Sequence, residues 1–303
     1  MRKQLLFTAL VIVLLASSAT AQDNLDSVMN TMSKTEKETV GPAFKAHRVI
    51  NLQTPEKTGA GNLQFLIQHR FGPINGGGYE FFGLDQSTIR IGLEYGINKW
   101  IAVGIGRSSF EKTYDGSVKV SLLNQSKGAH ASPVSLAYFG SVAINGLKWT
   151  DTSTRFKPAY RFSYTSQLII ASKISDRFSF EVVPTYIRKN LVETVRDNNN
   201  FFAVGTGARF KLTRRTSINA EYIFRIPPTD QTAPSYANFY NSFSLGFDIE
   251  TGGHVFQLHL TNSLPMIERG FITETSEKWN DAGIHLGFNI SRDFSFGKKA
   301  KKW

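Results

Sequence analysis

Cysteine is absent from this chain of 303 residues. Its absence excludes disulfide bonds, thiol catalysis and metal sites built on cysteine. It also excludes the lipid attachment of lipoproteins, which requires a cysteine at the start of the mature chain. If the chain is exported, its stability must therefore come from something other than disulfides.

Helical periodicity, long apolar runs and catalytic motifs are also scarce. After residue 21, no segment reaches the roughly 20 apolar residues of a membrane-spanning helix. The chain has no G-x-S-x-G or H-E-x-x-H motif, and the Gly76–Gly78 run is not followed by the Gly-Lys-Ser/Thr of a phosphate-binding loop. No Ser-His-acid set can be placed on one face. We therefore expect neither an enzyme nor a cofactor.

The first 21 residues are typical of a signal peptide. A positive start at Met1–Lys3 precedes an apolar run from Leu5 to Ala16, and Ala19–Ala21 has the small-x-small pattern of a cleavage site. Cleavage is expected between Ala21 and Gln22. The apolar run is short for a spanning helix, so a retained anchor helix is the less favoured alternative.

The formal net charge is +11, and 13% of the residues are aromatic. A basic balance can indicate nucleic acid as a partner. The export signal argues against that partner, so anionic lipid headgroups or anionic solutes are the more plausible counter-charges.

Residues 22–60 differ from the rest of the chain. The segment Asp23–Val40 is polar and contains a mixed-charge stretch at Lys34–Glu38. It could form a short helix or no regular structure. We assign residues 22–60 to a periplasmic N-terminal arm, with a plug as the alternative.

Residues 61–296 are dominated by alternation of apolar and polar residues, the pattern of strands with two unlike faces. For example, Ile89, Ile91 and Leu93 alternate with Arg90 and Glu94. Twelve strands are predicted, an even number as in single-chain bacterial barrels. They span residues 62–71, 88–97, 100–108, 116–123, 134–144, 160–170, 178–187, 202–212, 218–225, 241–249, 254–261 and 282–296.

The connections alternate between long and short, as the outer loops and periplasmic turns of a membrane barrel do. Two of them are ambiguous, because 107–115 is short for a loop and 124–133 is long for a turn. The fold expected is a closed antiparallel transmembrane β-barrel with both termini periplasmic. Closure leaves no unpaired strand edge in the lipid. The long connections include 72–86, 146–158, 190–200, 227–237 and 263–280, and the tight turns include 97–99, 172–177, 213–216 and 250–253.

Alternation places several charged residues on the face that lines the lumen. The basic surplus among them favours an anion-preferring channel, and interlocked salt bridges filling a narrow lumen are the alternative. The basic residues are Arg70, Arg90, Lys119, Arg161, Arg209, Lys211 and Arg225, and the acidic residues are Glu94, Glu181, Glu221 and Asp248.

Two histidines, His259 and His285, also face the lumen on neighbouring strands. Two close imidazoles could bind a metal or tune each other's protonation. They could equally belong to a polar lumen network, and we assign no metal to them.

Several short runs along the chain form a recognisable set. They are Phe44-Lys45, Arg48–Asn51, His69–Gly72, Phe82–Asp85, Arg90–Gly96, Val103–Ser108, Lys112–Gly116 and Gly287–Arg292. Together these runs resemble a family of Bacteroidetes outer-membrane β-barrel proteins whose domain has no assigned function. The resemblance covers roughly residues 42–296 and implies a β-barrel in the outer membrane of a Gram-negative cell. One departure from barrel proteins in general is a basic tail, 297–303, after the last expected strand.

These observations predict an integral outer-membrane barrel that acts as a small-solute or anion-favouring pore. The alternatives are a non-conducting scaffold that binds through its outer loops, and an enzyme acting on lipid or peptide. The expected partners are outer-membrane lipid, lipopolysaccharide, the barrel-assembly machinery and a small anionic solute, without nucleic acid.

Overall fold

The computed structural model describes residues 37–128, 130–149 and 157–296. The expected signal peptide with its cleavage site at Ala21 and Gln22, residues 22–36 of the expected arm and the basic tail lie outside the described residues. The chain divides into two units, of which the smaller comprises residues 1–40 and 125–133. Within it, β1 (Glu38–Thr39) pairs with β6 (Ser126–Lys127). No helix in the described part of the chain is long and apolar enough to span a membrane.

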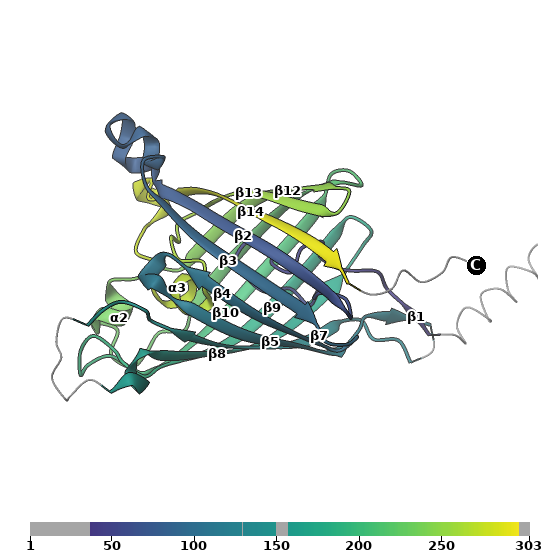
Figure 1. Ribbon diagram of the computed structural model, residues 1–303, viewed down its shortest axis with the longest axis horizontal. Helices are drawn as coiled ribbons and strands as arrows, with labels where there is room; N and C mark the ends of the chain where they lie inside the picture. Colours follow the sequence, from purple (N-terminus) through teal and green to yellow (C-terminus); the bar gives the residue numbers. More distant parts are fainter. Residues whose placement is uncertain (1–36, 129, 150–156, 297–303) are drawn as a thin grey trace, which may run out of the picture. The chain divides into compact units, whose positions relative to one another are not determined.

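Twelve antiparallel strands of the larger unit form a closed barrel (Figure 1). The barrel closes between the first and last of these strands, in a register that runs from His285 opposite Pro73 to Ser295 opposite Asn62. The predicted fold and strand number are confirmed. The strands are β2 (Asn62–Pro73), β3 (Ser87–Gly96), β4 (Ile101–Ser108), β5 (Tyr114–Leu123), β7 (Ser135–Ile144), β8 (Phe162–Lys173), β9 (Phe178–Lys189), β10 (Asn200–Lys211), β11 (Thr216–Arg225), β12 (Ser242–Thr251), β13 (His254–Thr261) and β14 (His285–Ser295).

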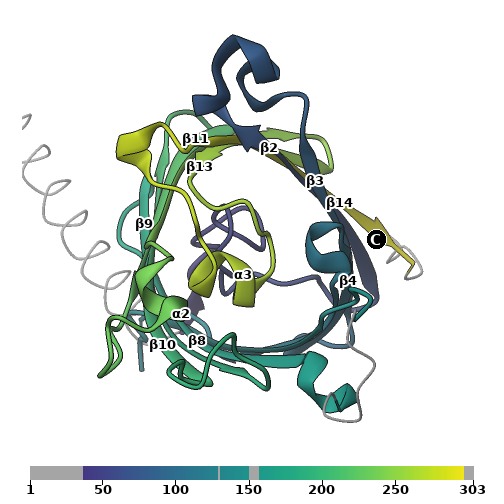
Figure 2. The same cartoon turned by 90° about the vertical axis from the view of Figure 1, so that its left-hand side faces the viewer.

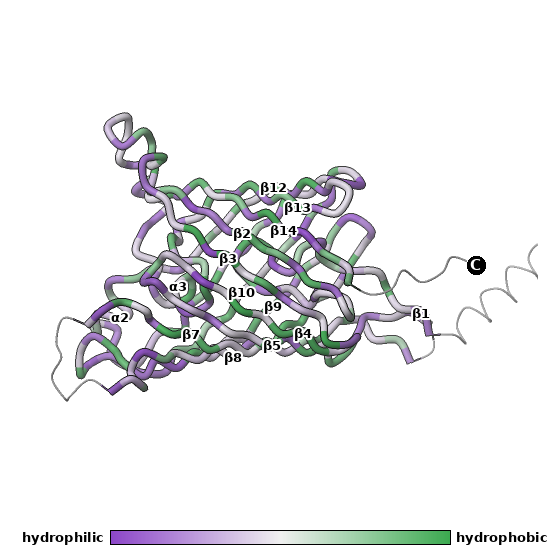
Figure 3. Tube along the Cα trace, viewed as in Figure 1, coloured by the Kyte–Doolittle hydropathy of each residue, from purple (hydrophilic) through white to green (hydrophobic). Residues whose placement is uncertain are grey.

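The two faces of each strand differ, and Figure 3 shows hydrophobic and hydrophilic residues alternating along the strands. On β3, Ile89 and Ile91 are 38% and 44% exposed, whereas Arg90 between them is 5% exposed. Backbone groups are satisfied by neighbouring strands all round the barrel, which is the condition for crossing lipid with strands. The apolar outer face therefore suits the hydrocarbon of a membrane.

The connections separate into two ends, here called the turn end and the loop end. The turn end has residues 97–100, 174–177, 212–215 and 252–253, together with 124–134, which is long because it contains β6. The other ambiguous link, expected at 107–115, is the short connection 109–113, and it lies at the loop end. The loop end carries η1 (Ile74–Gly83), η2 (Phe110–Lys112), η3 (Pro158–Arg161), α2 (Pro234–Ala237), α3 (Glu268–Thr273) and η4 (Trp279–Asp281).

Two segments are inserted into the lumen, and Figure 2 shows both inside the ring of strands. One is residues 43–58, here called the plug, and the other is the β13–β14 connection with α3. Residues 43–58 were expected to belong to a periplasmic arm. They lie in the lumen instead and form a plug, which was the alternative prediction. An apolar cluster joins the two segments to the wall and contains Phe44, Val49, Leu52, Phe271 and Ile272 with inward-facing Phe139, Ile169, Val183, Ile187 and Ile223.

Candidate functional site

The plug folds back on itself in a tight hairpin at residues 47–54, here called the plug hairpin. The Val49 amide donates to the Leu52 carbonyl at 2.9 Å, and the Thr54 amide donates to the His47 carbonyl at 3.0 Å. Such a tight turn leaves the N–H groups at its tip, those of residues 50–52, without partners in the hairpin. They must be satisfied by the wall, because an unpaired buried N–H costs the free energy of a lost hydrogen bond.

A single carboxylate, that of Glu221 on β11, satisfies these groups. It accepts hydrogen bonds from the amides of Ile50 at 3.2 Å, Asn51 at 2.9 Å and Leu52 at 3.0 Å. It also accepts one from the Asn51 side-chain amide at 2.6 Å. Successive N–H groups that converge in this way form an anion-binding nest. Glu221 is 2% exposed, so its charge is stabilised by the hairpin rather than by water.

Other inward-facing polar side chains bind the plug in the same manner. They come from β13, β14, β3 and β5, so several strands besides β11 hold the plug. As a result, much of the polar lumen face bonds to protein instead of lining a water-filled path. The bonds are Gln257 Nε2 to Val49 O at 2.8 Å, Asn289 Nδ2 to Ile50 O at 3.1 Å, Lys119 Nζ to Glu56 O at 2.8 Å and the Thr58 amide to Glu94 Oε1 at 2.8 Å.

Three inward-facing glycines provide the space that the plug hairpin occupies. Any larger residue there would push its side chain into the hairpin, so these positions fit the plug sterically. A Cβ would lie 2.7 Å from Leu52 Cδ2 at Gly205, 2.9 Å from Val49 Cγ2 at Gly207 and 3.0 Å from Ile50 Cδ1 at Gly246.

The plug hairpin meets α3 in the lumen through the Glu268 carboxylate. Glu268 Oε1 lies 2.8 Å from Arg48 Nη2 and accepts a hydrogen bond from Gln53 Nε2, also at 2.8 Å. Glu268 is 3% exposed and Arg48 is 6% exposed. A buried ion pair of this kind strongly penalises the loss of either partner, because the remaining charge stays desolvated.

Arg70 on β2 ties both inserted segments to the wall. Its guanidinium donates to the carbonyls of Ser263 at 2.7 Å and Pro265 at 2.8 Å in the β13–β14 connection. It also donates to Asn51 Oδ1 of the plug hairpin. One fully buried cation therefore holds the plug, the connection and the wall together.

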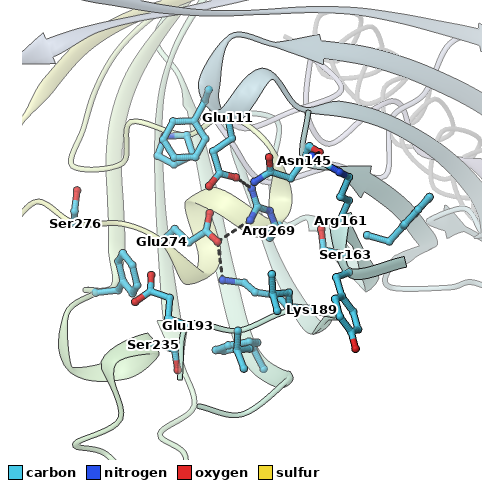
Figure 4. Close-up of a pocket in the computed structure, with 18 of the residues that line it drawn as sticks. Glu111, Asn145, Arg161, Ser163, Lys189, Glu193, Ser235, Arg269, Glu274 and Ser276 are labelled. Carbon is cyan, nitrogen blue, oxygen red and sulfur yellow. Dashed lines mark hydrogen bonds and ion pairs between the residues drawn. The ribbon is translucent and has the colours of Figure 1, made fainter. Parts of the chain in front are cut away.

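A pocket of about 400 Å³ opens at the loop end, where Arg269 of α3 is one of the residues that line it (Figure 4). Its size falls in the range of about 300–1,000 Å³ found for small-molecule sites. Six aromatic residues line it, namely Phe110, Trp149, Tyr160, Phe162, Phe201 and Phe239. The polar residues that line it are Glu111, Asn145, Arg161, Ser163, Lys189, Glu193, Ser235, Arg269, Glu274 and Ser276.

Four of these polar residues form a continuous series of ion pairs, here called the ion-pair chain. Figure 4 shows Arg269 between Glu111 and Glu274, with Lys189 reaching Glu274 from the other side. Glu274 Oε1 lies 2.9 Å from Arg269 Nη1 and 2.7 Å from Lys189 Nζ. Burial alone would raise the pKa of the Glu274 carboxyl, but the charges of Arg269 and Lys189 outweigh it and hold that pKa below its usual value.

Residues 44–294 match the family described as a membrane bound beta barrel domain, DUF5777. The chain belongs to this family. The match confirms the resemblance inferred from the sequence runs, and it covers the barrel together with most of the plug.

Solved structures similar to this membrane-bound β-barrel include porins and channels. The NanC porin has a TM-score of 0.47 and 8% identity, over 78% of this chain and 100% of that chain. The KdgM porin has a TM-score of 0.45 and 8% identity, over 78% and 99%. An outer-membrane channel from Pseudomonas putida F1 has a TM-score of 0.42 and 12% identity, over 83% and 100%. No curated protein matches the chain.

Most charged residues expected in the lumen of this membrane-bound β-barrel lie on the inward faces of its strands. They are Arg70, Arg90, Glu94, Lys119, Glu181, Arg209, Glu221, Arg225 and Asp248. Alternation did not find Asp115, whose carboxylate accepts from Arg90 Nε at 3.0 Å, because the expected strand began one residue later. Lys211 lies half-buried at the turn end of β10.

Arg161 is placed differently from the expectation. It ends η3 at the loop end, where its guanidinium donates to the Asn145 carbonyl at 2.8 Å and lies 4.0 Å from the Trp149 ring centre. It therefore contributes to the pocket instead of the strand wall.

His259 and His285 both face the lumen, but each has its own partner. Arg70 Nε donates to His259 Nε2 at 3.4 Å, whereas His285 Nδ1 lies 2.9 Å from the Phe71 carbonyl oxygen. In the described ranges, no group of three or more histidine, cysteine or acidic residues could hold a metal ion. His259 thus belongs to the polar network around Arg70, whereas His285 contacts the backbone of β2.

Proposed function

We propose that the protein is an integral outer-membrane barrel that keeps a small-solute path closed in the conformation described here. Its family, its closed sheet and its apolar outer face support a location in lipid. In this proposal the turn end is periplasmic and the loop end meets lipopolysaccharide outside the cell. Insertion would depend on the barrel-assembly machinery.

The contact of Glu268 with Arg48 and Gln53 carries this proposal. It joins the plug, which precedes β2 and enters from the turn end, to a segment that enters from the loop end. Because both partners are buried and charged, the contact favours a closed lumen until one segment moves.

The charges of the wall argue against a strong anion preference. Most of the charged strand residues that face the lumen in the described part offset one another, and Lys189 and Lys211 at strand ends leave a small basic surplus. The offsetting residues are Arg70, Arg90, Lys119, Arg209 and Arg225 against Glu94, Asp115, Glu181, Glu221 and Asp248. We therefore propose a path without strong ion selectivity.

The pocket at the loop end favours a second function, the binding of a ligand by the outer loops. This is compatible with a closed lumen, since the pocket lies above α3. The proposal assigns no catalysis to the protein.

Single-channel recording in planar bilayers tests the closed lumen. The full-length protein is expected to show no steady conductance, whereas deletion of residues 43–56 should produce steady open channels. A matched control deletes part of η1, which lies outside the lumen. Heat-modifiable migration on gels verifies that each variant forms a barrel. Steady conductance of the full-length protein equal to that of the plug deletion would refute the proposal.

A further inference from the structure

The basic side chains of the loop-end pocket are poorly placed to bind an anion. Its cations are already engaged, since Lys189 and Arg269 pair with Glu274 and Arg161 donates to backbone carbonyls. An anionic ligand would have to break one of these interactions. Removing one member of a desolvated pair leaves the other charge unpaired, which costs several kcal/mol.

One residue that lines the pocket has a spare acceptor. The second carboxylate oxygen of Glu274, Oε2, is buried beneath the pocket surface and has no hydrogen-bond partner among the described residues, so a ligand reaches it when the Glu274 side chain turns toward the pocket. A buried unsatisfied acceptor is costly, so a ligand that donates to it gains that free energy on binding.

A cation is a poor choice of donor for this oxygen. Lys189 Nζ and Arg269 Nη1 lie 2.7 Å and 2.9 Å from the other oxygen of the same carboxylate. A third positive charge would be held beside both of them, and like charges at such distances repel strongly in a low-dielectric site. A neutral hydroxyl donates to Glu274 Oε2 without this repulsion.

A purely apolar ligand also fits badly, because it would desolvate polar groups without pairing them. Asn145, Ser163, Ser235 and Ser276 stand among the aromatic residues of the wall. A ligand that carries hydroxyls on a ring satisfies both kinds of lining, since its hydroxyls pair with the polar groups and its ring lies against the aromatic side chains.

From this chemistry we propose that the loop-end pocket binds a short neutral saccharide, with Glu274 Oε2 accepting a hydrogen bond from one of its hydroxyls. The aromatic residues, Phe239 among them, pack against the sugar ring. The volume of about 400 Å³ suits a small molecule of this class.

The site also bears on the closed lumen, and this step rests on the proposed function. Arg269 belongs to the pocket, while the preceding residue, Glu268, holds Arg48 and Gln53 of the plug hairpin. Both lie on α3, so a ligand that shifts α3 would also disturb the contacts of Glu268 with the plug hairpin. The saccharide site itself does not require that coupling.

Isothermal titration of the full-length protein in detergent tests the site. The probes are the neutral disaccharides maltose, cellobiose, lactose and sucrose, with digalacturonate as the anionic probe and the glucosamine dimer as the cationic probe. At least one neutral disaccharide should bind, and more tightly than either charged probe. Glu274→Gln should weaken its binding about tenfold or more, because a hydrogen bond to a charged acceptor is lost. Asp230→Asn is the matched control, since it breaks an exposed ion pair with Arg196, and neither residue lines the pocket.

A second pair of variants avoids the ion-pair chain and its effect on folding. Phe239→Leu keeps an apolar side chain but removes a ring from the pocket, and binding should weaken several-fold. Phe243→Leu makes the same change on β12 outside the pocket and should leave binding unchanged.

Three results would overturn the inference: no neutral disaccharide binds, a charged probe binds more tightly than all of them, or Glu274→Gln and Phe239→Leu both bind as the unsubstituted protein does. The conductance of the same preparations separates this failure from that of the proposed function. A closed barrel that binds no saccharide contradicts only the pocket assignment, and a conducting barrel that binds one contradicts only the closed lumen.

Discussion

At the scale of single residues, Glu221 does more than any other wall residue to hold the plug. Its carboxylate accepts from three consecutive backbone amides and from the Asn51 side chain. Hydrogen bonds to charged groups contribute about 1.5–3 kcal/mol each. Glu221→Gln keeps the shape of the side chain but removes its charge, so we expect the plug hairpin to be destabilised by about 3 kcal/mol.

Hydrogen–deuterium exchange of the peptide that covers residues 47–54 measures this effect. A loss of about 3 kcal/mol corresponds to exchange roughly a hundredfold faster, at about 1.4 kcal/mol for each factor of ten. Asp176→Asn neutralises a carboxylate in the exposed β8–β9 turn and should leave the exchange of this peptide unchanged. Equal exchange in Glu221→Gln and the unsubstituted protein would show that the nest does not hold the hairpin.

At the scale of the structural elements, the strands were predictable and the plug was predictable only as an alternative. Alternation reveals a strand because its two faces meet different surroundings, whichever strand lies beside it. The plug hairpin lacks such a local signal, since its amides are satisfied by Glu221, 170 residues away along the chain from Asn51. The apolar run Val49-Ile50 in a polar segment was one hint in the sequence. Inward-facing Ile169, Val183 and Ile223 gave another, because they break the polar face of their strands.

The carboxylate of Asp197 holds α2 to the connection 190–199, and its titration makes this contact depend on pH. Asp197 accepts from the Ser235 amide of α2 at 2.8 Å and from the Thr194 amide at 2.9 Å. Burial opposes ionisation, but these hydrogen bonds outweigh it and lower the pKa of Asp197. A lowered folded-state pKa stabilises the connection above the unfolded value, about 3.9, and this stability is lost as pH falls through the folded-state pKa.

We therefore expect the connection 190–199 to keep its protection between pH 8 and 5 and to lose it in strong acid. Pepsin cleavage within residues 190–199, followed from pH 4 down to pH 2, measures the loss. Asp197→Asn should expose the same connection to thermolysin at neutral pH, while Asp176→Asn at the turn end should not. Protection of Asp197→Asn at neutral pH as strong as in the unsubstituted protein would mean that the Asp197 carboxylate does not secure α2.

At the scale of the whole molecule, the plug and the barrel wall are stabilised in different ways. The wall closes through the pairing of its strands, whereas the plug depends on side chains of that wall. Removing the plug should therefore leave a folded barrel whose lumen exposes the balanced charges of the wall. The basic surplus expected from the sequence shrinks because Asp115 joins the acidic set, while Arg161 and Lys211 lie away from the middle of the lumen.

This balance predicts the selectivity of the opened barrel. With residues 43–56 deleted, the reversal potential in a potassium chloride gradient should lie close to zero. Adding Glu181→Gln and Glu221→Gln to the deletion removes two acidic wall charges and should shift that potential toward anion preference. Adding Arg209→Gln instead should shift it toward cations. A strong anion preference of the deletion variant by itself would contradict the balance, because it would mean that the acidic residues of the wall, Glu181 and Glu221 among them, do not carry their charge in the open lumen.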